Sequence, residues 1–228
     1  MTDLRASSSI TNFLEQFVAK AYAKGEIIVF QGEAPRTALI VKSGVIKIYN
    51  LNQNGDEKPV GFRFTGDPFP VSWLFGKAPS ALYYYEALTD VVLYHVPREQ
   101  YVAHLRKNPD LLYGELERMV VDDMGNLLRL NALQHSRARD KLIYTLHYLV
   151  VSRARLITPD TAEILLDLTH QDFANLTGLT RETAATELNK LKGLGVISYG
   201  KHEPYRVKVK ELNKALNDQT VAEVKQLR

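Results

Sequence analysis

The segment at residues 169–193 constrains the fold more than any other part of the chain. Thr169 and Asp172 are suited to begin a helix, because a threonine oxygen accepts a bond from an early helical N–H and a carboxylate is favoured at the positive helix end. Gly178 can end that helix, since glycine adopts the left-handed conformation of a helix C-cap. Thr180 can then cap a second helix. Two short helices joined by a glycine turn at this spacing predict a helix-turn-helix.

The second helix, expected over residues 181–192 with Gly193 just beyond its end, carries side chains that suit the major groove of DNA. Arg181 can bond guanine O6 and N7, and Glu182 can accept from cytosine N4. Threonine hydroxyls in the first turn suit phosphates, which position the protein rather than specify sequence. Taken alone, two charges at this position usually belong to an ordinary solvated helix turn. The predicted DNA-contacting residues are Thr169, His170, Gln171, Thr180, Arg181, Glu182, Thr183, Thr186, Lys201, His202 and Arg206.

Two alternating segments after this helix, residues 196–199 and 205–209, predict a pair of strands joined by a loop. This arrangement is typical of a wing, whose cations Lys201 and Arg206 would meet the DNA backbone. Residues 137–228 have a net charge of +4, whereas residues 1–136 have a net charge of −1. The basic excess therefore lies beside the predicted helix-turn-helix, where it suits a polyanion.

The absence of cysteine removes several classes of function. It excludes disulfides, thiolate-held zinc, iron–sulfur clusters and thiol catalysis. The sequence also shows no metal-ligand cluster, phosphate loop or nucleophile motif, so we expect no enzyme, no bound metal and no required cofactor. The first residues lack the apolar core of a signal peptide, and no apolar run approaches the ~20 residues of a membrane span. We therefore expect a cytoplasmic protein with no membrane partner.

Residues 25–105 have a different character, with recurring glycines between short β-rich runs. A helix is expected before them, near residues 10–21. The runs 27–30 and 91–96 are good strand candidates, and Gly55 follows asparagine in a good hairpin turn. Many short strands with regular turns predict an antiparallel roll or barrel.

A long helix is expected from Pro109 to about Gln134, because apolar residues recur there at spacings of three and four. A helix of ~26 residues would be ~39 Å long. A narrow stripe of this length is typical of packing against a partner helix, although packing on the β domain is the alternative. The predicted dimer interface is Leu112, Leu116, Val120, Met124, Leu127 and Leu130. Further along, residues 139–153 predict an amphipathic helix and residues 164–168 a short strand.

Four segments in order resemble the CRP/FNR family of bacterial transcription factors: Ala23–Glu33, Ser43–Tyr49, Asn108–Asp110 and Leu179–Ile197. The resemblance implies an α+β fold, with an N-terminal antiparallel β-roll of the double-stranded β-helix or jelly-roll type over residues 1–107. It further implies a dimerisation helix over residues 108–136 and a winged helix-turn-helix over residues 137–228. Such a protein would act as a homodimer on a palindromic double-stranded DNA operator, with RNA polymerase as a further partner.

The chain departs from the members of this family that bind cAMP. Those members carry a Phe-Gly-Glu-Leu stretch and a later arginine for the cyclic phosphate, whereas this chain has Phe69-Pro70-Val71-Ser72 and then Lys77-Ala78-Pro79-Ser80-Ala81-Leu82. A phosphate buried without a cation is costly, so cAMP is not expected and the effector is unknown. Either an aromatic, weakly polar effector binds here or these residues are core. An effector-independent regulator whose β-roll is a protein-interaction scaffold is the alternative. The candidate effector pocket is Val71, Trp73, Ser80, Ala81, Tyr83 and Tyr85.

Overall fold

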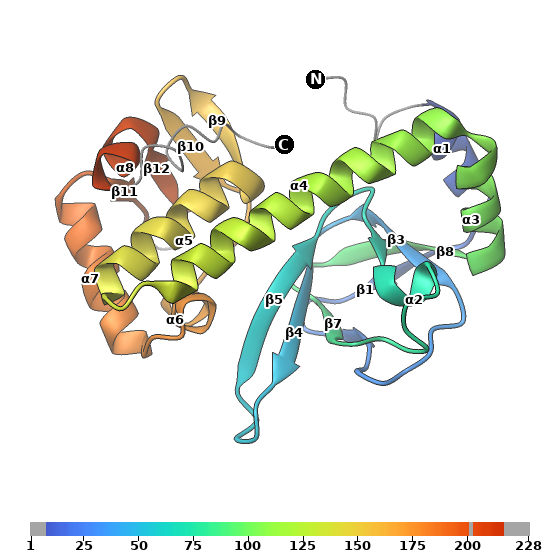
Figure 1. The fold of residues 1–228 in the computed structure, drawn as a ribbon, viewed down its shortest axis with the longest axis horizontal. Helices are drawn as coiled ribbons and strands as arrows, with labels where there is room; N and C mark the ends of the chain where they lie inside the picture. Colours follow the sequence, from blue (N-terminus) through green and yellow to red (C-terminus); the bar gives the residue numbers. More distant parts are fainter. Residues whose placement is uncertain (1–7, 201–202, 217–228) are drawn as a thin grey trace. The chain divides into compact units, whose positions relative to one another are not determined.

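The computed structural model describes residues 8–200 and 203–216, and the chain divides into two compact units, residues 1–116 and 117–228 (Figure 1). The division falls inside the long helix α4 (Pro109–Gln134), so this helix contributes to both units. Within the described ranges, no helix combines the length and apolar character that a membrane crossing requires.

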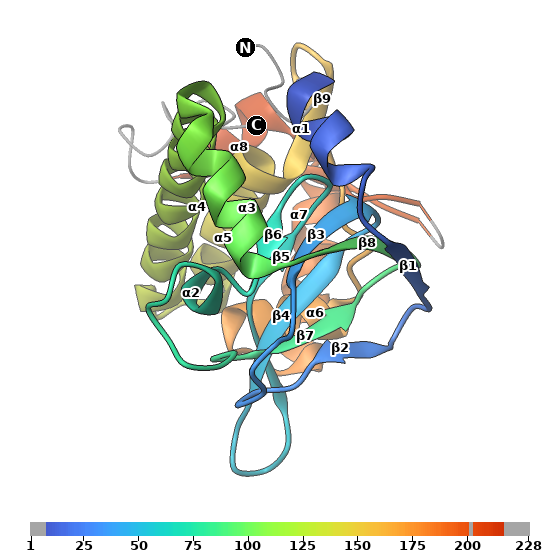
Figure 2. The same cartoon turned by 90° about the vertical axis from the view of Figure 1, so that its right-hand side faces the viewer.

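The N-terminal unit is an antiparallel β-roll built from two four-stranded sheets (Figure 2). The strand orders are β1-β8-β3-β6 and β2-β7-β4-β5, and every pairing is antiparallel. This matches the predicted roll. Its elements are α1 (Ser8–Leu14), β1 (Ala19–Tyr22), β2 (Ile27–Val29), β3 (Ala38–Ser43), β4 (Ile46–Leu51), β5 (Glu57–Arg63), β6 (Pro68–Phe69), α2 (Val71–Leu74), β7 (Tyr84–Ala87), β8 (Val91–Val96) and α3 (Arg98–Lys107).

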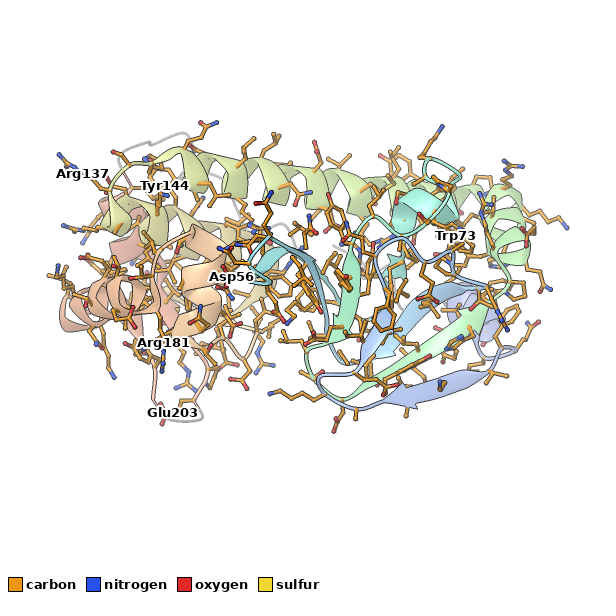
Figure 3. All side chains as sticks on the ribbon, turned by 90° about the horizontal axis from the view of Figure 1, so that it is seen from below. Asp56, Trp73, Arg137, Tyr144, Arg181 and Glu203 are labelled. Atoms are coloured by element: carbon orange, nitrogen blue, oxygen red, sulfur yellow. The ribbon has the colours of Figure 1, made fainter. Side chains whose placement is uncertain are left out.

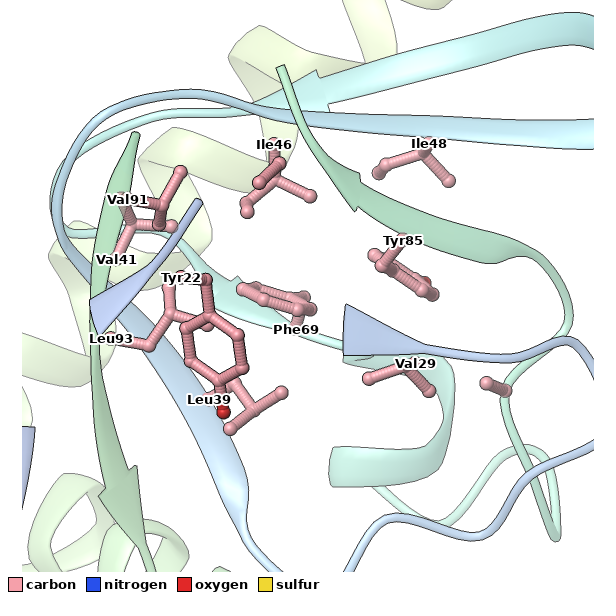
Figure 4. Close-up of a cluster of buried hydrophobic side chains, with 12 residues drawn as sticks. Tyr22, Val29, Leu39, Val41, Ile46, Ile48, Phe69, Tyr85, Val91 and Leu93 are labelled. Atoms are coloured by element: carbon pink, nitrogen blue, oxygen red, sulfur yellow. The ribbon is translucent and has the colours of Figure 1, made fainter. Parts of the chain in front are cut away.

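The interior of the roll is filled by side chains that the strands alternately turn inward. Ile46 and Ile48 of β4 enter this core, together with Tyr85 of β7 (Figure 4). The rings of Phe69 and Tyr85 stack with centroids 5.1 Å apart. The buried members of this cluster are Tyr22, Val29, Leu39, Val41, Ile46, Ile48, Phe69, Ala81, Tyr85, Ala87, Val91 and Leu93.

The predicted first helix was too long. Helix α1 ends at Leu14, and the chain turns extended so that Ala19–Tyr22 can pair with β8. Leu14 instead packs into a second core cluster with Tyr101 and Leu105 of α3. The ladder with β8 provides backbone hydrogen bonds that the local helical pattern does not reveal.

The C-terminal unit joins helices to a small antiparallel sheet of order β11-β12-β10-β9. The pairs Ile197 with Val207 and Ala162 with Val207 set the register of its central strand. Besides α4, its elements are α5 (Ala138–Arg153), β9 (Ala154–Thr158), β10 (Thr161–Ile164), α6 (His170–Thr177), α7 (Arg181–Gly193), β11 (Ile197–Ser198), β12 (Arg206–Lys208) and α8 (Val209–Ala215).

Helix α5 is not amphipathic, contrary to expectation. Every residue from Leu142 to Arg153 is buried, because α6, α7, α8 and the β9–β10 hairpin all contact this helix. Two of its buried polar residues have these contacts: Ser152 Oγ donates to the carbonyl of Tyr148 at 2.6 Å, and Arg153 lies 3.6 Å from Asp122 of α4.

The strand expected over residues 164–168 was also misplaced. The strand is β10 (Thr161–Ile164), which pairs with β9 (Ala154–Thr158) in a hairpin that the sequence did not indicate. Residues 165–168 do alternate between exposed and buried, but they follow the end of β10. Alternation alone is thus insufficient where the partner strand is set by tertiary contacts.

Candidate nucleic-acid interface

Helix α6 begins with the predicted cap. Thr169 Oγ1 accepts from the Asp172 backbone N–H at 3.2 Å, and the Thr169 N–H donates to Asp172 Oδ2 at 2.8 Å, so the two residues form a capping box. The helix ends at Gly178, which has the left-handed angles φ 68° and ψ 25°. Phe173 and Ala174 are buried beneath it. His170 is half-buried, and Gln171 is exposed.

Helix α7 is capped by Thr180, whose Oγ1 accepts from the Thr183 N–H at 3.2 Å and lies 2.9 Å from the Thr183 hydroxyl. Arg181 opens the helix at the exposed surface (Figure 3). Glu182 and Thr186 are exposed as well. The opposite face is anchored, since Ala184, Leu188 and Leu191 are buried. The helix includes Gly193, which was expected beyond its end, and the left-handed residue is Gly195 with φ 72°.

The wing strands are β11 and β12, while Lys201 and His202 lie outside the described residues. Arg206 of β12 is held by an ion pair, because its Nε lies 3.2 Å from Glu163 Oε2. Glu163 forms a second ion pair, in which its Oε1 lies 2.8 Å from Nη2 of Arg155. Hydrogen bonds from Arg155 and Arg206 lower the pKa of Glu163. Arg206 therefore has a fixed carboxylate partner that any DNA phosphate must share or replace.

The apolar stripe of α4 is exposed along its whole predicted length. The six predicted residues, Leu112, Leu116, Val120, Met124, Leu127 and Leu130, are between 37% and 58% exposed. Tyr113, Met119 and Leu133 of the same helix are exposed too and were not predicted. The buried face is different: Gly125 and Ala132 are covered. An added Cβ at Gly125 would lie 3.5 Å from side-chain atoms of Tyr148 and Ser152, so α4 packs on α5 through this face.

The residues predicted as an effector pocket are distributed between two core clusters. Ala81 and Tyr85 belong to the interior of the roll, and Tyr83 packs against it. Trp73 instead packs against the cluster beneath α1 and α3, and the Arg98 guanidinium lies 5.3 Å from its ring centroid. Val71 and Ser80 are half-buried. The structure thus places Tyr83, Tyr85 and Ala81 together and Trp73 elsewhere.

Arg63, a basic residue that was not predicted as part of the site, affects the pKa of a tyrosine in this interior. Burial raises the pKa of the Tyr85 phenol to about 12, although the positive charge of Arg63 opposes the shift. Arg63 ends β5 opposite Ile46, an inward-facing residue of β4. The register of β4 and β5 was the missing signal, because it decides which face of the sheet Arg63 occupies.

Two family models match the chain: a cyclic nucleotide-binding domain over residues 19–108 and a Crp-like helix-turn-helix domain over residues 140–214. The global nitrogen regulator of Synechococcus elongatus is 30% identical over 183 residues, which cover 79% of this chain and 81% of that protein. The chain belongs to the CRP/FNR family of transcriptional regulators. The relatives that match this CRP/FNR regulator are transcription regulators and not enzymes.

Two further similar proteins share less of their sequence with this chain. The cyclic AMP receptor protein of Thermus thermophilus is 26% identical over 202 residues, covering 87% of this chain and 86% of that protein. A solved structure of a CooA mutant from Carboxydothermus hydrogenoformans matches with a TM-score of 0.73 and 19% identity, covering 94% of each chain. The latter likeness concerns the fold alone. Within this CRP/FNR regulator, α6 and α7 form the helix-turn-helix and β11 and β12 its wing.

Proposed function

We propose that this CRP/FNR regulator is a homodimeric transcription factor that binds a palindromic DNA operator and responds to an effector in its β-roll. The proposal rests above all on α7. Its N-terminal turn offers Arg181 and Glu182 to solvent, and Thr186 is exposed one turn further on, while the opposite face is buried and the N-termini of α6 and α7 are capped. A rigid helix with an exposed, hydrogen-bonding N-terminal turn is what base reading in the major groove requires.

Selection of bound DNA from a random pool tests this function and yields the operator. Arg181→Ala should then cost ~1–3 kcal/mol on the selected operator and relax the preference at one position per half-site. Lys201→Ala should instead weaken binding to all sequences and reduce the salt dependence by about one counterion per subunit. If Arg181→Ala changes neither affinity nor sequence preference, α7 does not read bases.

The dimer is supported by the exposed stripe of α4, because nine large apolar side chains on one helix are costly to leave in water. Two-fold symmetry would place the two α7 helices ~34 Å apart, about one turn of DNA. Sedimentation should show a dimer at micromolar concentration. Leu116→Glu with Leu127→Glu should shift it to monomer, whereas Leu156→Glu, an equally exposed leucine of β9, should not.

We also propose that cAMP is not the effector and that no cofactor is required. None of the twelve buried residues of this cluster carries a charge, and residues 77–82 lack the arginine that the cAMP-binding members use for the phosphate. The positive charge of Arg63 does reach Tyr85, but Arg63 lies at the end of β5 and not in the segment that binds the phosphate in those members. Calorimetry with cAMP should show no micromolar binding. The filled interior also favours the competing function, a regulator whose β-roll is an interaction scaffold. A thermal-shift screen with small metabolites separates the two, and copurification with RNA polymerase tests the remaining proposed partner.

A further inference from the structure

Tyr199 follows β11 directly and contacts α7 at two points. Its hydroxyl donates to Asn189 Oδ1 at 2.8 Å, and its carbonyl accepts from Lys192 Nζ at 2.8 Å. The Lys192 ammonium also lies 4.5 Å from the centroid of the Tyr199 ring. The base of the wing is therefore tied to the second half of α7 by hydrogen bonds as well as by a cation–π contact.

The ring of Tyr199 is held from its other sides by α6 and β12. It stacks on Tyr205 with centroids 4.6 Å apart, and Tyr205 in turn lies 4.9 Å from Phe173. His170 meets the ring edge-on at 5.6 Å. Burial raises the pKa of Tyr199, so its hydroxyl keeps its proton and remains a donor. Because the ring is fixed, the position of its hydroxyl oxygen is fixed too, and the hydrogen bond to Asn189 Oδ1 sets the direction of the O–H bond.

Asn189 lies on the exposed face of α7. It follows Thr186 by three residues and Glu182 by seven, which places all three on one side of the helix, opposite the buried Leu188 and Leu191. Since Asn189 Oδ1 accepts from Tyr199, the NH₂ group of the same amide is turned away from Tyr199. A carboxamide whose oxygen is occupied in this way presents a donor.

We propose that Asn189 is an additional DNA-contacting residue that donates its NH₂ group to a backbone phosphate, and that Tyr199 is the positioning residue that orients this amide. The inference rests on the proposed DNA binding. Residues at the start of a recognition helix read base edges, and Asn189 is two turns further along, where the helix runs towards the backbone. Side-chain amides are regular phosphate donors, and such contacts fix register without reading sequence.

Because Asn189 is uncharged, the salt dependence of DNA binding distinguishes its contact from that of a cation. A cation that binds phosphate releases a counterion and so contributes to the salt dependence, whereas a neutral donor does not. Asn189→Ala should therefore weaken binding to all sequences, roughly threefold to tenfold per subunit, the value of one hydrogen bond. The slope of log affinity against log salt should not change. Asn189→Lys should bind more tightly at low salt and steepen the slope by about one counterion per subunit.

Tyr199→Phe keeps the ring contacts and loses only the bond to Asn189. It should weaken binding measurably, by no more than Asn189→Ala does, and unchanged affinity would show that Tyr199 does not position the amide. The double variant should be no weaker than Asn189→Ala, because the two residues act through one contact. The matched control is Tyr22→Phe, which loses a hydroxyl contact to His95 in the β-roll and should leave DNA affinity unchanged. Circular dichroism should show that all variants are folded at the temperature of the binding assay.

Titration of each variant against the selected operator and a scrambled duplex, at several salt concentrations, decides the matter. Asn189→Ala with wild-type affinity, or Asn189→Lys with an unchanged salt slope, would overturn the proposal. So would additive losses in the double variant. A wild-type chain that selects no DNA would refute the proposed function instead, and Arg181→Ala tests that function separately through sequence preference.

Discussion

The glycines that end α6 and α7 allow a sharp test, because they should respond to alanine with opposite signs. Gly178 has φ 68°, and an added Cβ meets no heavy atom of the described residues within 4 Å. The same openness holds at Gly193, which is helical and lacks the positive φ. Neither substitution creates a clash, so only the backbone conformation distinguishes them.

Gly178→Ala should destabilise the C-terminal unit by ~1 kcal/mol, because a Cβ in the left-handed conformation approaches the following carbonyl. Gly193→Ala should stabilise it by several tenths of a kcal/mol, since alanine has a propensity advantage of up to ~1 kcal/mol over glycine in a helix. For a unit of this size a change of 1 kcal/mol shifts the melting temperature by about 4 °C. Gly178→Asn should recover part of the loss, because asparagine tolerates the left-handed region.

Thermal melting monitored by circular dichroism measures these shifts in melting temperature, and operator binding is a second measurement. Sequence preference should survive Gly178→Ala, because the caps at Thr169 and Thr180 still define the helix starts. Equal losses for Gly178→Asn and Gly178→Ala would contradict the backbone argument, and so would destabilisation by Gly193→Ala.

Three further predictions concern the caps, the buried phenol and the buried ammonium. Thr169→Ala should cost ~1 kcal/mol of stability by opening the capping box with Asp172, as denaturant unfolding would show. The pKa of Tyr85 is about 12 against an ordinary 10, so its protonated form stabilises the fold below pH 10, and that contribution is lost as the pH rises towards 12. The loss amounts to ~2–3 kcal/mol, and Tyr85→Phe should flatten the stability profile over that interval. Lys47 lies 2.6 Å from Glu57 and 3.1 Å from Glu86, so Lys47→Met should cost roughly 1–3 kcal/mol in urea unfolding. Adding Glu86→Gln should restore part of that loss, and a fully additive double variant would show that the pair is not coupled.

The features that local chemistry determines were predictable from the sequence. The caps at Thr169 and Thr180 and the turn at Gly178 depend on residues within one helical turn, and all three are confirmed. The alternation of Tyr83 to Tyr85 was also informative. Tyr85 enters the core, whereas Tyr84 faces the other way and stacks on Tyr49 at 5.3 Å.

Features that depend on distant partners were not predictable. Strand β9 exposes both Leu156 and Ile157, so it lacks the alternating pattern of a half-buried strand, and its pairing with β10 sets it instead. The bond between Tyr199 and Asn189 joins residues ten positions apart on different elements. Their side chains meet only after α7 and the wing have packed together.

The burial of α5 from Leu142 to Arg153 has a consequence for the motions of the C-terminal unit. A helix covered by α6, α7, α8 and the β9–β10 hairpin cannot expose its amides while those neighbours stay in place. Its N–H groups should therefore exchange with solvent deuterium more slowly than those of α6 or α7, and at a rate close to that of global opening. Helices α6 and α7 each keep one exposed face, so their amides can exchange by local opening at the helix ends without the unit losing its fold.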